Sequence, residues 1–335
     1  MHWSLRHLLL KKKMVTVSII IPTYQRPKLL ANCLKALLQQ KFDRHHYEII
    51  VVSDGPDEPT KAVINQWSLY DHPQIKYLPL PQKKGPAGAR NYGWLNAKGS
   101  IIAFTDDDCL PNAHWLQQIV AHCDPQKEIA ITGRVIVPIS GRPTDHEQNT
   151  AHLQTAEFIT ANCACTKKAL IKAGGFDEEF EIAWREDSDL HFKFIYNNVP
   201  ITKVDSAIVV HPVRASPWGV SIKEQKKTMY NALLYKKHQD LYDRLIRQKT
   251  PVFYYCIIAA FLMMIAGWIT QHHTLFTVGF AGWAGLTALL TYKRLKNTSL
   301  AVSHVVEMVY TSIIIPFASV FWQWYGAIKY RVLFI

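Results

Sequence analysis

Several features that would place this chain in a common functional class are missing from its sequence. The six cysteines form no Cys-x-x-Cys pair and no other spacing that indicates zinc, so we expect reduced thiols in a cytosolic compartment. No internal repeat and no nucleic-acid motif is evident, although the net charge is +12. The first lysines follow the first apolar residues, which is the wrong order for a secretory signal. These absences argue against zinc-dependent, nucleic-acid-binding and secreted proteins.

Glycine is missing from the loop where a phosphate-binding turn would need it. The β-branched run Val15–Ile21 predicts a first strand, and the loop after it reads Pro22-Thr23-Tyr24-Gln25-Arg26. A sugar nucleotidyltransferase would want a Gly-rich phosphate loop at this place, so that class is disfavoured.

Strand and helix patterns alternate through the first two thirds of the chain and predict an α/β fold with a doubly wound, mostly parallel sheet. Ser140 to Thr150 is polar and predicts a mobile loop. The expected strands are Val15–Ile21, Glu48–Val52, Ile75–Leu80, Ile101–Phe104, Ile129–Val137, Asn162–Cys165 and Val204–Val210.

Three adjacent carboxylates, Asp106, Asp107 and Asp108, follow the apolar strand Ile101–Phe104. Like charges repel unless a counter-charge is present, and a divalent cation such as Mg²⁺ or Mn²⁺ takes oxygen ligands and often holds substrate phosphates. Ligands of open α/β sheets bind at the carboxyl ends of strands, where this cluster falls. The alternative is a solvated acidic turn that caps the helix beginning near Ala113.

Other polar residues fall at neighbouring strand ends. Tyr24 and Arg26 follow the first strand, Asp54 follows the second, and Arg90 enters a helix. This set suits a nucleotide: an aromatic ring for the base, Asp54 for a base N–H, and Arg90 with a metal for phosphate oxygens.

The last third of the chain is apolar and suggests a membrane. Val252–Ile269 and Leu275–Leu290 are candidate transmembrane helices, and Val305–Ile328 is a third apolar segment interrupted by Glu307 and Pro316. The third segment either spans or forms a re-entrant or interfacial helix bent at Pro316. Basic clusters flank the first two segments and predict a hairpin with both ends in the cytoplasm.

These patterns divide the chain into four regions. Residues 1–14 form a basic arm, in which Met14 is an alternative start, and 15–215 form the α/β domain. Residues 216–250 form a basic amphipathic linker that could lie on an anionic membrane surface or dock on the α/β domain, and 251–335 form the membrane region.

The α/β region contains a series of motifs in this order: Ile20-Ile21-Pro22-Thr23-Tyr24-Gln25-Arg26, Val51-Val52-Ser53-Asp54-Gly55, Gly88-Ala89-Arg90-Asn91, Phe104-Thr105-Asp106-Asp107-Asp108, Gly174-Gly175-Phe176-Asp177-Glu178 and Arg185-Glu186-Asp187. In these motifs and their order it resembles glycosyltransferase family 2, whose nucleotide-sugar-binding fold is called GT-A, and in particular a membrane-anchored, bacterial-type member.

The resemblance implies roles for individual residues. Asp106 and Asp108 would hold Mn²⁺ or Mg²⁺, His211 would complete the metal site, and Asp187 would be the catalytic base, with Glu186 next in line. The other residues assigned to substrates are Pro22, Thr23, Tyr24, Arg26, Asp54, Arg90, Asp106 and Asp107 for the donor and Gly174, Gly175 and Trp184 on the acceptor side. For His211 and Trp184 a purely structural role is the alternative.

The expected function is metal-dependent, inverting transfer of a sugar, most simply from a UDP-sugar, to a lipid-linked or glycan acceptor held at the membrane. We expect a multi-pass protein of the plasma (inner) membrane, with its catalytic domain on the cytoplasmic face and no nucleic-acid partner. Processive synthases of the family carry a Q-x-x-R-W signature, but here Gln225-Lys226-Lys227-Thr228-Met229 lacks both Arg and Trp, which favours non-processive transfer. A processive polysaccharide synthase and a catalytically silent nucleotide-sugar-binding subunit are the alternatives.

Overall fold

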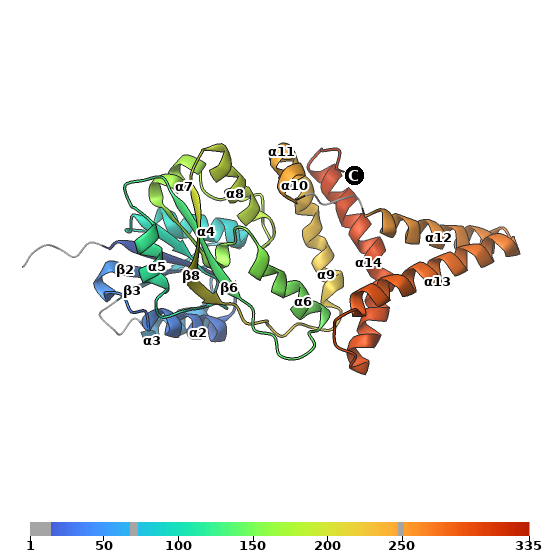
Figure 1. The fold of residues 1–335 in the computed structure, drawn as a ribbon, viewed down its shortest axis with the longest axis horizontal. Coiled ribbons are helices and arrows are strands. Elements are labelled where there is room, and N and C mark those ends of the chain that lie inside the picture. The colour runs from blue at the N-terminus through green and yellow to red at the C-terminus, as the bar shows by residue number, and fades with distance from the viewer. Residues whose placement is uncertain (1–14, 68–72, 247–250, 335) are drawn as a thin grey trace, which may run out of the picture. The chain divides into compact units, whose positions relative to one another are not determined.

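The computed structural model describes residues 15–67, 73–246 and 251–334, so the basic arm 1–14 lies outside it. The chain divides into two compact units, drawn in Figure 1. The first contains the chain up to Val137 together with Leu153–Pro212, and the second contains Pro138–His152 together with Val213 onward. The short segment Pro138–His152 therefore leaves the α/β domain and packs with the C-terminal helices.

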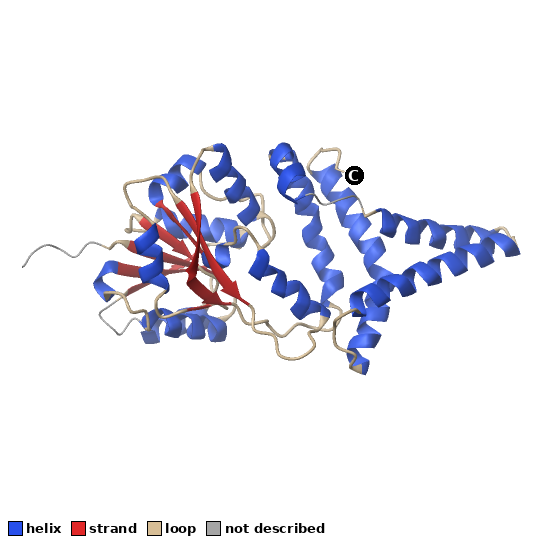
Figure 2. Ribbon diagram, in the orientation of Figure 1, coloured by secondary structure: helices blue, strands red, loops and turns tan. Residues whose placement is uncertain are grey.

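The first unit is built on a mixed sheet of eight described strands in the order β3-β2-β1-β4-β7-β6-β8-β5, shown in red in Figure 2. β1 to β4 run parallel, β7 is antiparallel to both of its neighbours, and β8 is parallel to β6. The α/β class is confirmed, but the sheet is less parallel than expected because of β7 and β5. The strands are β1 (Val17–Thr23), β2 (Tyr47–Ser53), β3 (Gln74–Pro79), β4 (Ile101–Phe104), β5 (Leu110–Pro111), β6 (Ala130–Ile136), β7 (Cys163–Thr166) and β8 (Ile201–Val210).

Both faces of the sheet are covered by helices. Ile20, Val52 and Phe104 belong to one apolar cluster with residues of α4, α7 and α8, while Ile19 and Ile21 point to the opposite face and are equally buried. Strands buried on both faces need continuous apolar runs, which the sequence supplies. The helices of this unit are α2 (Pro27–Leu38), α3 (Glu58–Trp67), α4 (Gly85–Leu95), α5 (Trp115–His122), α7 (Lys167–Ala173) and α8 (Glu186–Tyr196).

A bulge between Gly133 and Arg134 shifts the register between β6 and β8, and Asn162 holds it in place. The amide of Asn162 donates to the carbonyls of Arg134 and Ala207 at 2.9 and 2.8 Å and accepts from the Trp115 indole at 2.8 Å. A side chain at Gly133 would collide with Asn162 and Ala207, so only glycine fits there. This packing fixes the end of β8.

The polar segment expected to be a mobile loop contains a helix, α6 (Asp145–Ala151). Thr144 and Glu147 form a capping box, in which the threonine hydroxyl accepts from the Glu147 N–H and the glutamate accepts from the Thr144 N–H. The T-x-x-E pattern that produces this cap was present in the sequence. The expectation of a loop was wrong because it relied on the polar composition of the segment and overlooked the capping box.

Among its described residues, the second unit contains three helices that are long and apolar enough to cross a membrane: α12 (Val252–Ile269), α13 (His273–Leu295) and α14 (Val302–Lys329). α12 and α13 form a hairpin in which Gly267 and Gly279 let the two backbones approach closely. α14 continues through Pro316 as one helix, and whether it spans the membrane or lies in its interface stays a prediction.

The basic linker buries a run of its apolar residues within the second unit. It forms α9 (Val220–Glu224), α10 (Met229–Lys237) and α11 (Gln239–Leu241), with a one-turn helix before α10 and a π-helical turn after α11. Met229, Tyr230, Leu233 and Leu234 are buried, and Gly326 of α14 lies directly against the Met229 backbone. The interfacial expectation is therefore corrected for these residues: they pack within the second unit.

Candidate functional site

Chain direction brings the predicted residues to one edge of the sheet. β1, β2 and β4 are parallel, so the loops after Thr23, Ser53 and Phe104 leave the same edge. β7 reverses direction and β6 reverses again, so β8 runs the same way as β4. Val210 and the following His211 therefore reach the edge at which the acidic cluster lies.

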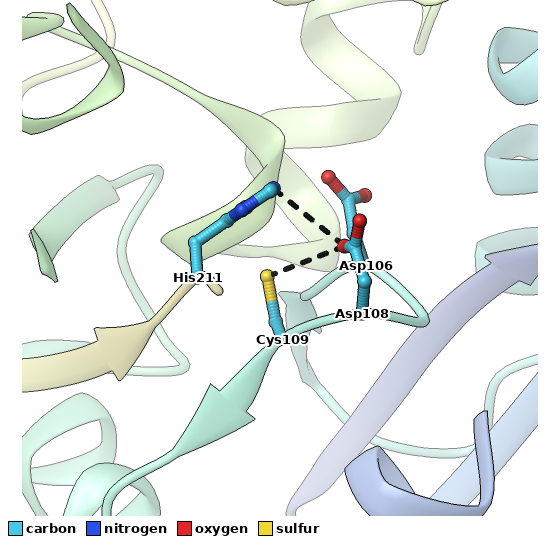
Figure 3. A group of neighbouring side chains, drawn as sticks. All are labelled: Asp106, Asp108, Cys109 and His211. Atoms are coloured by element: carbon cyan, nitrogen blue, oxygen red, sulfur yellow. Dashed lines mark hydrogen bonds and ion pairs between the residues drawn. The ribbon is translucent and has the colours of Figure 1, made fainter. Parts of the chain in front are cut away.

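The structure brings together Asp106, Asp108, Cys109 and His211, whose candidate ligand atoms all lie within 4.8 Å of one another. Figure 3 shows His211, at the end of β8, pointing toward Asp108, with Cys109 beside them before β5. The His211 Nε2 lies 3.6 Å from Asp108 Oδ1, and no hydrogen-bond partner is described for the buried Nδ1. Asp106 is the more exposed of the two carboxylates.

This donor set fits a hard cation. The two carboxylates supply the oxygen ligands that suit Mn²⁺ and Mg²⁺, and His211 adds an imidazole nitrogen. Burial, with the neighbouring Asp106 and Asp108 carboxylates, raises the pKa of Cys109 well above its usual value, so its thiol stays protonated. Cys109 was not foreseen as a neighbour of the cluster, although its position next to Asp108 is visible in the sequence.

Asp107 is not part of this group of candidate ligands, and its side chain is 3% exposed. Its Oδ2 accepts the Thr23 hydroxyl at 2.7 Å, and its Oδ1 lies 3.3 Å from the Arg26 guanidinium. Burial raises the pKa of Asp107 to about 6 despite these two partners. Asp107 thus ties the loop after β1 to the acidic cluster, while the predicted donor contacts of Pro22, Thr23 and Asp107 stay predictions.

Arg90, on α4, bridges two carboxylates inside the first unit. Its Nη2 lies 2.8 Å from Asp106 Oδ1, its Nη1 lies 3.0 Å from Glu186 Oε1, and the side chain is 2% exposed. We had expected this arginine to bind donor phosphates, but a guanidinium enclosed by two carboxylates is not open to a phosphate. The correction gives Arg90 a positioning role: it couples the acidic cluster to the start of α8.

Glu186 and Asp187 begin α8 but have different surroundings. Glu186 is buried and bound by Arg90, and burial together with the Asp187 charge raises its pKa to about 7. Asp187 is half-buried, accepts the Ser188 N–H at 2.7 Å, and has its pKa raised, chiefly by burial. Of the two, Asp187 is better placed to meet a substrate, and a raised pKa suits a general base.

The residue before α8 has an unusual backbone conformation. Arg185 has φ of 74°, in the left-handed region that costs a non-glycine residue energy. Its guanidinium carbon lies 4.9 Å from the centre of the Trp184 ring, and Trp184 is partly exposed. Strained residues cluster at functional sites, and an exposed indole three residues before Asp187 suits the predicted sugar platform, which stays a prediction.

Asp54 has a structural task. Its oxygens accept the backbone N–H groups of Lys84 and Gly85 at 2.7 to 3.1 Å, which anchors the start of α4. The predicted contact with a base N–H has no geometric support here and stays a prediction. Tyr24 is exposed, and the Lys83 ammonium lies 3.8 Å from its ring centre.

A hollow of about 430 Å³ lies beside the loops that follow β1 and β2, and it is lined by Gln25, Pro27, Pro56, Asp57, Glu58 and Pro59. Asp57 was missed by sequence reasoning. Its carboxylate accepts the backbone N–H groups of Gln25 and Thr60, which joins the first two strand-end loops. The signal was the Asp-x-x-Thr pattern that opens α3.

Gly174 and Gly175 close α7 in left-handed conformations, with φ of 77° and 69°. Asn91, one residue after Arg90, bonds the following turn through the Phe176 N–H and C=O, both at 2.9 Å. The Gly174-Gly175 turn is therefore fastened to α4, and its place on the acceptor side stays a prediction.

Comparisons with known proteins identify this domain. Residues 18–179 match the family model described as Glycosyl transferase family 2. Glycosyltransferase AglE of Haloferax volcanii is 28% identical over 217 residues, which is 62% of this chain and 70% of AglE. The GalNAc(5)-diNAcBac-PP-undecaprenol beta-1,3-glucosyltransferase of Campylobacter jejuni is 30% identical over 181 residues, 50% of this chain and 56% of that protein. The chain therefore carries a glycosyltransferase family 2 domain.

Longer relatives and solved structures agree with this assignment. Chondroitin synthase of Escherichia coli is 27% identical over 282 residues, and the match spans only 39% of that protein. The mannosyltransferase PcManGT of Pyrobaculum calidifontis, solved with GDP-Man and Mn²⁺, superposes with a TM-score of 0.56 at 18% identity, covering 96% of this chain and 93% of its own. S. aureus TarS 1–349, solved with UDP, gives 0.50 at 15% identity, covering 92% of each chain. The GT-A fold is confirmed.

The stability of the metal-free protein should depend on pH through Asp107. Its pKa is raised from 3.8 to about 6, so the folded protein keeps a proton that the unfolded chain releases, and stability falls as pH rises through this window. Asp107→Asn removes this loss of stability. In EDTA, the free energy of unfolding of the variant, relative to that of the wild type, should rise by about 1–3 kcal/mol between roughly pH 4.5 and 7.5. Denaturant unfolding of the full chain measures this difference. The opposite result, a wild type that is more stable than Asp107→Asn at the upper end of this pH range, would show that the ionised Asp107 is stabilised by Arg26.

Proposed function

We propose that this protein is a metal-dependent, inverting glycosyltransferase that moves a sugar from a nucleoside-diphosphate sugar to an acceptor held at the membrane. One observation carries the proposal: the candidate metal-binding carboxylates and the candidate base Asp187 are separate groups, with Arg90 bonded to Asp106 on one side and to Glu186, the neighbour of Asp187, on the other. A carboxylate that binds a cation is a poor base, so the reaction needs this separation.

Each residue has a distinct task in the proposed reaction. Asp106, Asp108 and His211 would hold Mn²⁺ or Mg²⁺, which when bound neutralises charge on the leaving diphosphate. Asp187 would take the proton of the acceptor hydroxyl as its oxygen forms a bond to the anomeric carbon and the bond to the diphosphate breaks. Attack from the side opposite to the leaving group inverts the configuration at the anomeric carbon. Trp184 would pack against a sugar face.

The membrane helices and the relatives support an acceptor at the membrane. The Campylobacter jejuni relative is named for an undecaprenol-linked acceptor, and three helices here have the length and composition of membrane spans. The solved neighbours were determined with GDP-Man and with UDP. Comparing UDP-sugars with GDP-sugars as donors therefore tests our expectation of a UDP-sugar.

A processive polysaccharide synthase is the second candidate, because chondroitin synthase and hyaluronan synthase are among the relatives. The incomplete signature at Gln225–Met229 favours addition of one or a few sugars. The length of the product chain distinguishes the two functions. A silent subunit is disfavoured, because the candidate metal ligands and base are all present.

Asp108→Asn should abolish metal-dependent donor binding. Replacing a buried carboxylate beside His211 with a neutral amide removes charge that the cation needs, so Mn²⁺-dependent affinity for UDP or GDP should fall by about 100-fold or more. Calorimetry on the full chain measures this, with Asp205→Asn on the exposed face of β8 as the matched control. Equal Mn²⁺-dependent affinity in both variants would remove Asp108 from the metal site.

Asp187→Asn should separate catalysis from binding. The amide keeps the shape of the side chain but cannot accept a proton, so kcat should fall by about 10²–10⁴-fold while donor affinity is unchanged. Transfer assays and calorimetry on the same preparation give both values, and Asp124→Asn at an exposed site is the control. Transfer at near wild-type rate would place the base elsewhere, with Glu186 the next candidate.

The catalytic domain should lie on the cytoplasmic face of the plasma (inner) membrane. By the positive-inside rule, Lys293 and Lys296 predict that the end of α13 is cytoplasmic. Single cysteines at Gln271 and Asn297, with the exposed Cys256 replaced by serine, test this in intact cells. An impermeant reagent should label position 271 and not 297. The reverse pattern would invert the topology, and labelling at neither position would argue against spanning.

A further inference from the structure

Charged residues at the start of α14 lie where an apolar membrane helix would not need them. His304 and Glu307 line a cavity of about 210 Å³ within the second unit, together with the start of α6 and the loop before α9, which contributes Ser216 and Trp218. Ionisable residues in apolar helices are costly and mark functional sites. The proposed transfer reaction gives them no task.

His304 is the least satisfied group in this cavity. Its side chain is 6% exposed, and neither ring nitrogen has a hydrogen-bond partner among the described residues. The nearest carboxylate oxygen, Glu307 Oε2, lies 4.0 Å from Nδ1, which is too long for a hydrogen bond. A buried polar ring without partners costs free energy, and a polar ligand in the cavity would recover it.

Glu307 lines the cavity beside His304, three residues further along α14. Its Oε1 accepts the Gly219 N–H at 2.7 Å, which fixes the loop that carries Trp218, and its Oε2 remains as an acceptor. Trp218 is 51% exposed, and its ring centre lies 5.1 Å from that of Tyr310 on α14. The cavity therefore combines a supported indole, a carboxylate oxygen and an imidazole.

The charges of the cavity argue against an anionic ligand. Asp145 is neutralised by Arg294 at 2.8 Å, and that arginine is also bonded to Thr311 and Ser221, so it is not available to a phosphate. The remaining Glu307 carboxylate would repel an anion. The metal-ligand cluster found among the described residues is the one around Asp108, in the first unit, so a divalent cation is not favoured here.

These features suit a neutral ring that carries hydroxyl groups. The hydroxyls of a sugar donate to a carboxylate and exchange hydrogen bonds with a neutral imidazole, while its C–H face packs on an exposed indole. The volume is below that of pockets for drug-sized ligands, which limits the occupant to about one ring. We propose that this cavity binds one neutral sugar unit of the acceptor, an inference that rests on the proposed glycosyl transfer.

The test measures sugar binding to the full chain in nanodiscs without donor or metal. Neutral monosaccharides and their octyl glycosides (glucose, galactose, mannose and their N-acetylated amino sugars) serve as probes in saturation-transfer NMR. At least one should bind the wild type, and Trp218→Ala and His304→Leu should each weaken it by about 10-fold, the size of one lost hydrogen bond or packing contact. The matched controls are Trp268→Ala and His273→Leu, both at exposed positions, which should bind as the wild type does.

Two further measurements distinguish a failure of the cavity proposal from a failure of the proposed transfer. UDP and GDP binding with Mn²⁺ should be unchanged in Trp218→Ala, which also shows that this variant is folded, and its KM for acceptor should rise with kcat unchanged. If no probe binds the wild type, or the cavity variants bind as the controls do, the cavity is not a sugar site, whatever the donor measurements show. If sugar binds but no donor does, the proposed transfer fails, and with it the acceptor role.

Discussion

The ion pairs of Arg90 with Asp106 and Glu186 are the interaction on which the candidate site depends. Carboxylates from the loop after β4 and from the start of α8 can be buried close together only because a guanidinium lies between them. Removing one partner of such a network typically costs about 3–5 kcal/mol, because it leaves an uncompensated buried charge. Arg90 thereby sets the spacing between the candidate metal ligands and Asp187, the next residue after Glu186.

Strand direction supplies the rest of the site. Because β7 is inserted antiparallel between β4 and β6, β8 ends at the same edge as β4 and brings His211 to Asp108. The bulge held by Asn162 fixes that end. In the second unit Arg294 has a similar part: its partly buried guanidinium binds Asp145 of α6 to α14 through Thr311 and Ser312. Each unit thus uses an arginine to join segments far apart in sequence.

The acidic cluster was predictable because a short buried strand running into three aspartates has few alternative interpretations. Its nearness to His211 required the resemblance, since sequence does not reveal how β6, β7 and β8 pair. The bridge from Arg90 to Glu186 could not be foreseen, because its partners are 96 residues apart and an arginine at a helix entrance equally suits a phosphate. The α6 helix was missed although its capping box was visible. The burial of α10 against α14 was hidden because one amphipathic pattern serves a membrane surface and a protein surface alike.

The central claim is that Asp106, Asp108 and His211 hold a cation on the donor diphosphate. Anomalous diffraction from crystals of the full chain grown with Mn²⁺ and a nucleoside diphosphate tests it most directly. We expect a manganese peak between the Asp108 and His211 side chains, in contact with the phosphate oxygens and separate from Asp187. A nucleotide bound at this edge without a manganese peak, or a peak coordinated by Asp187, would contradict the division between metal ligands and base.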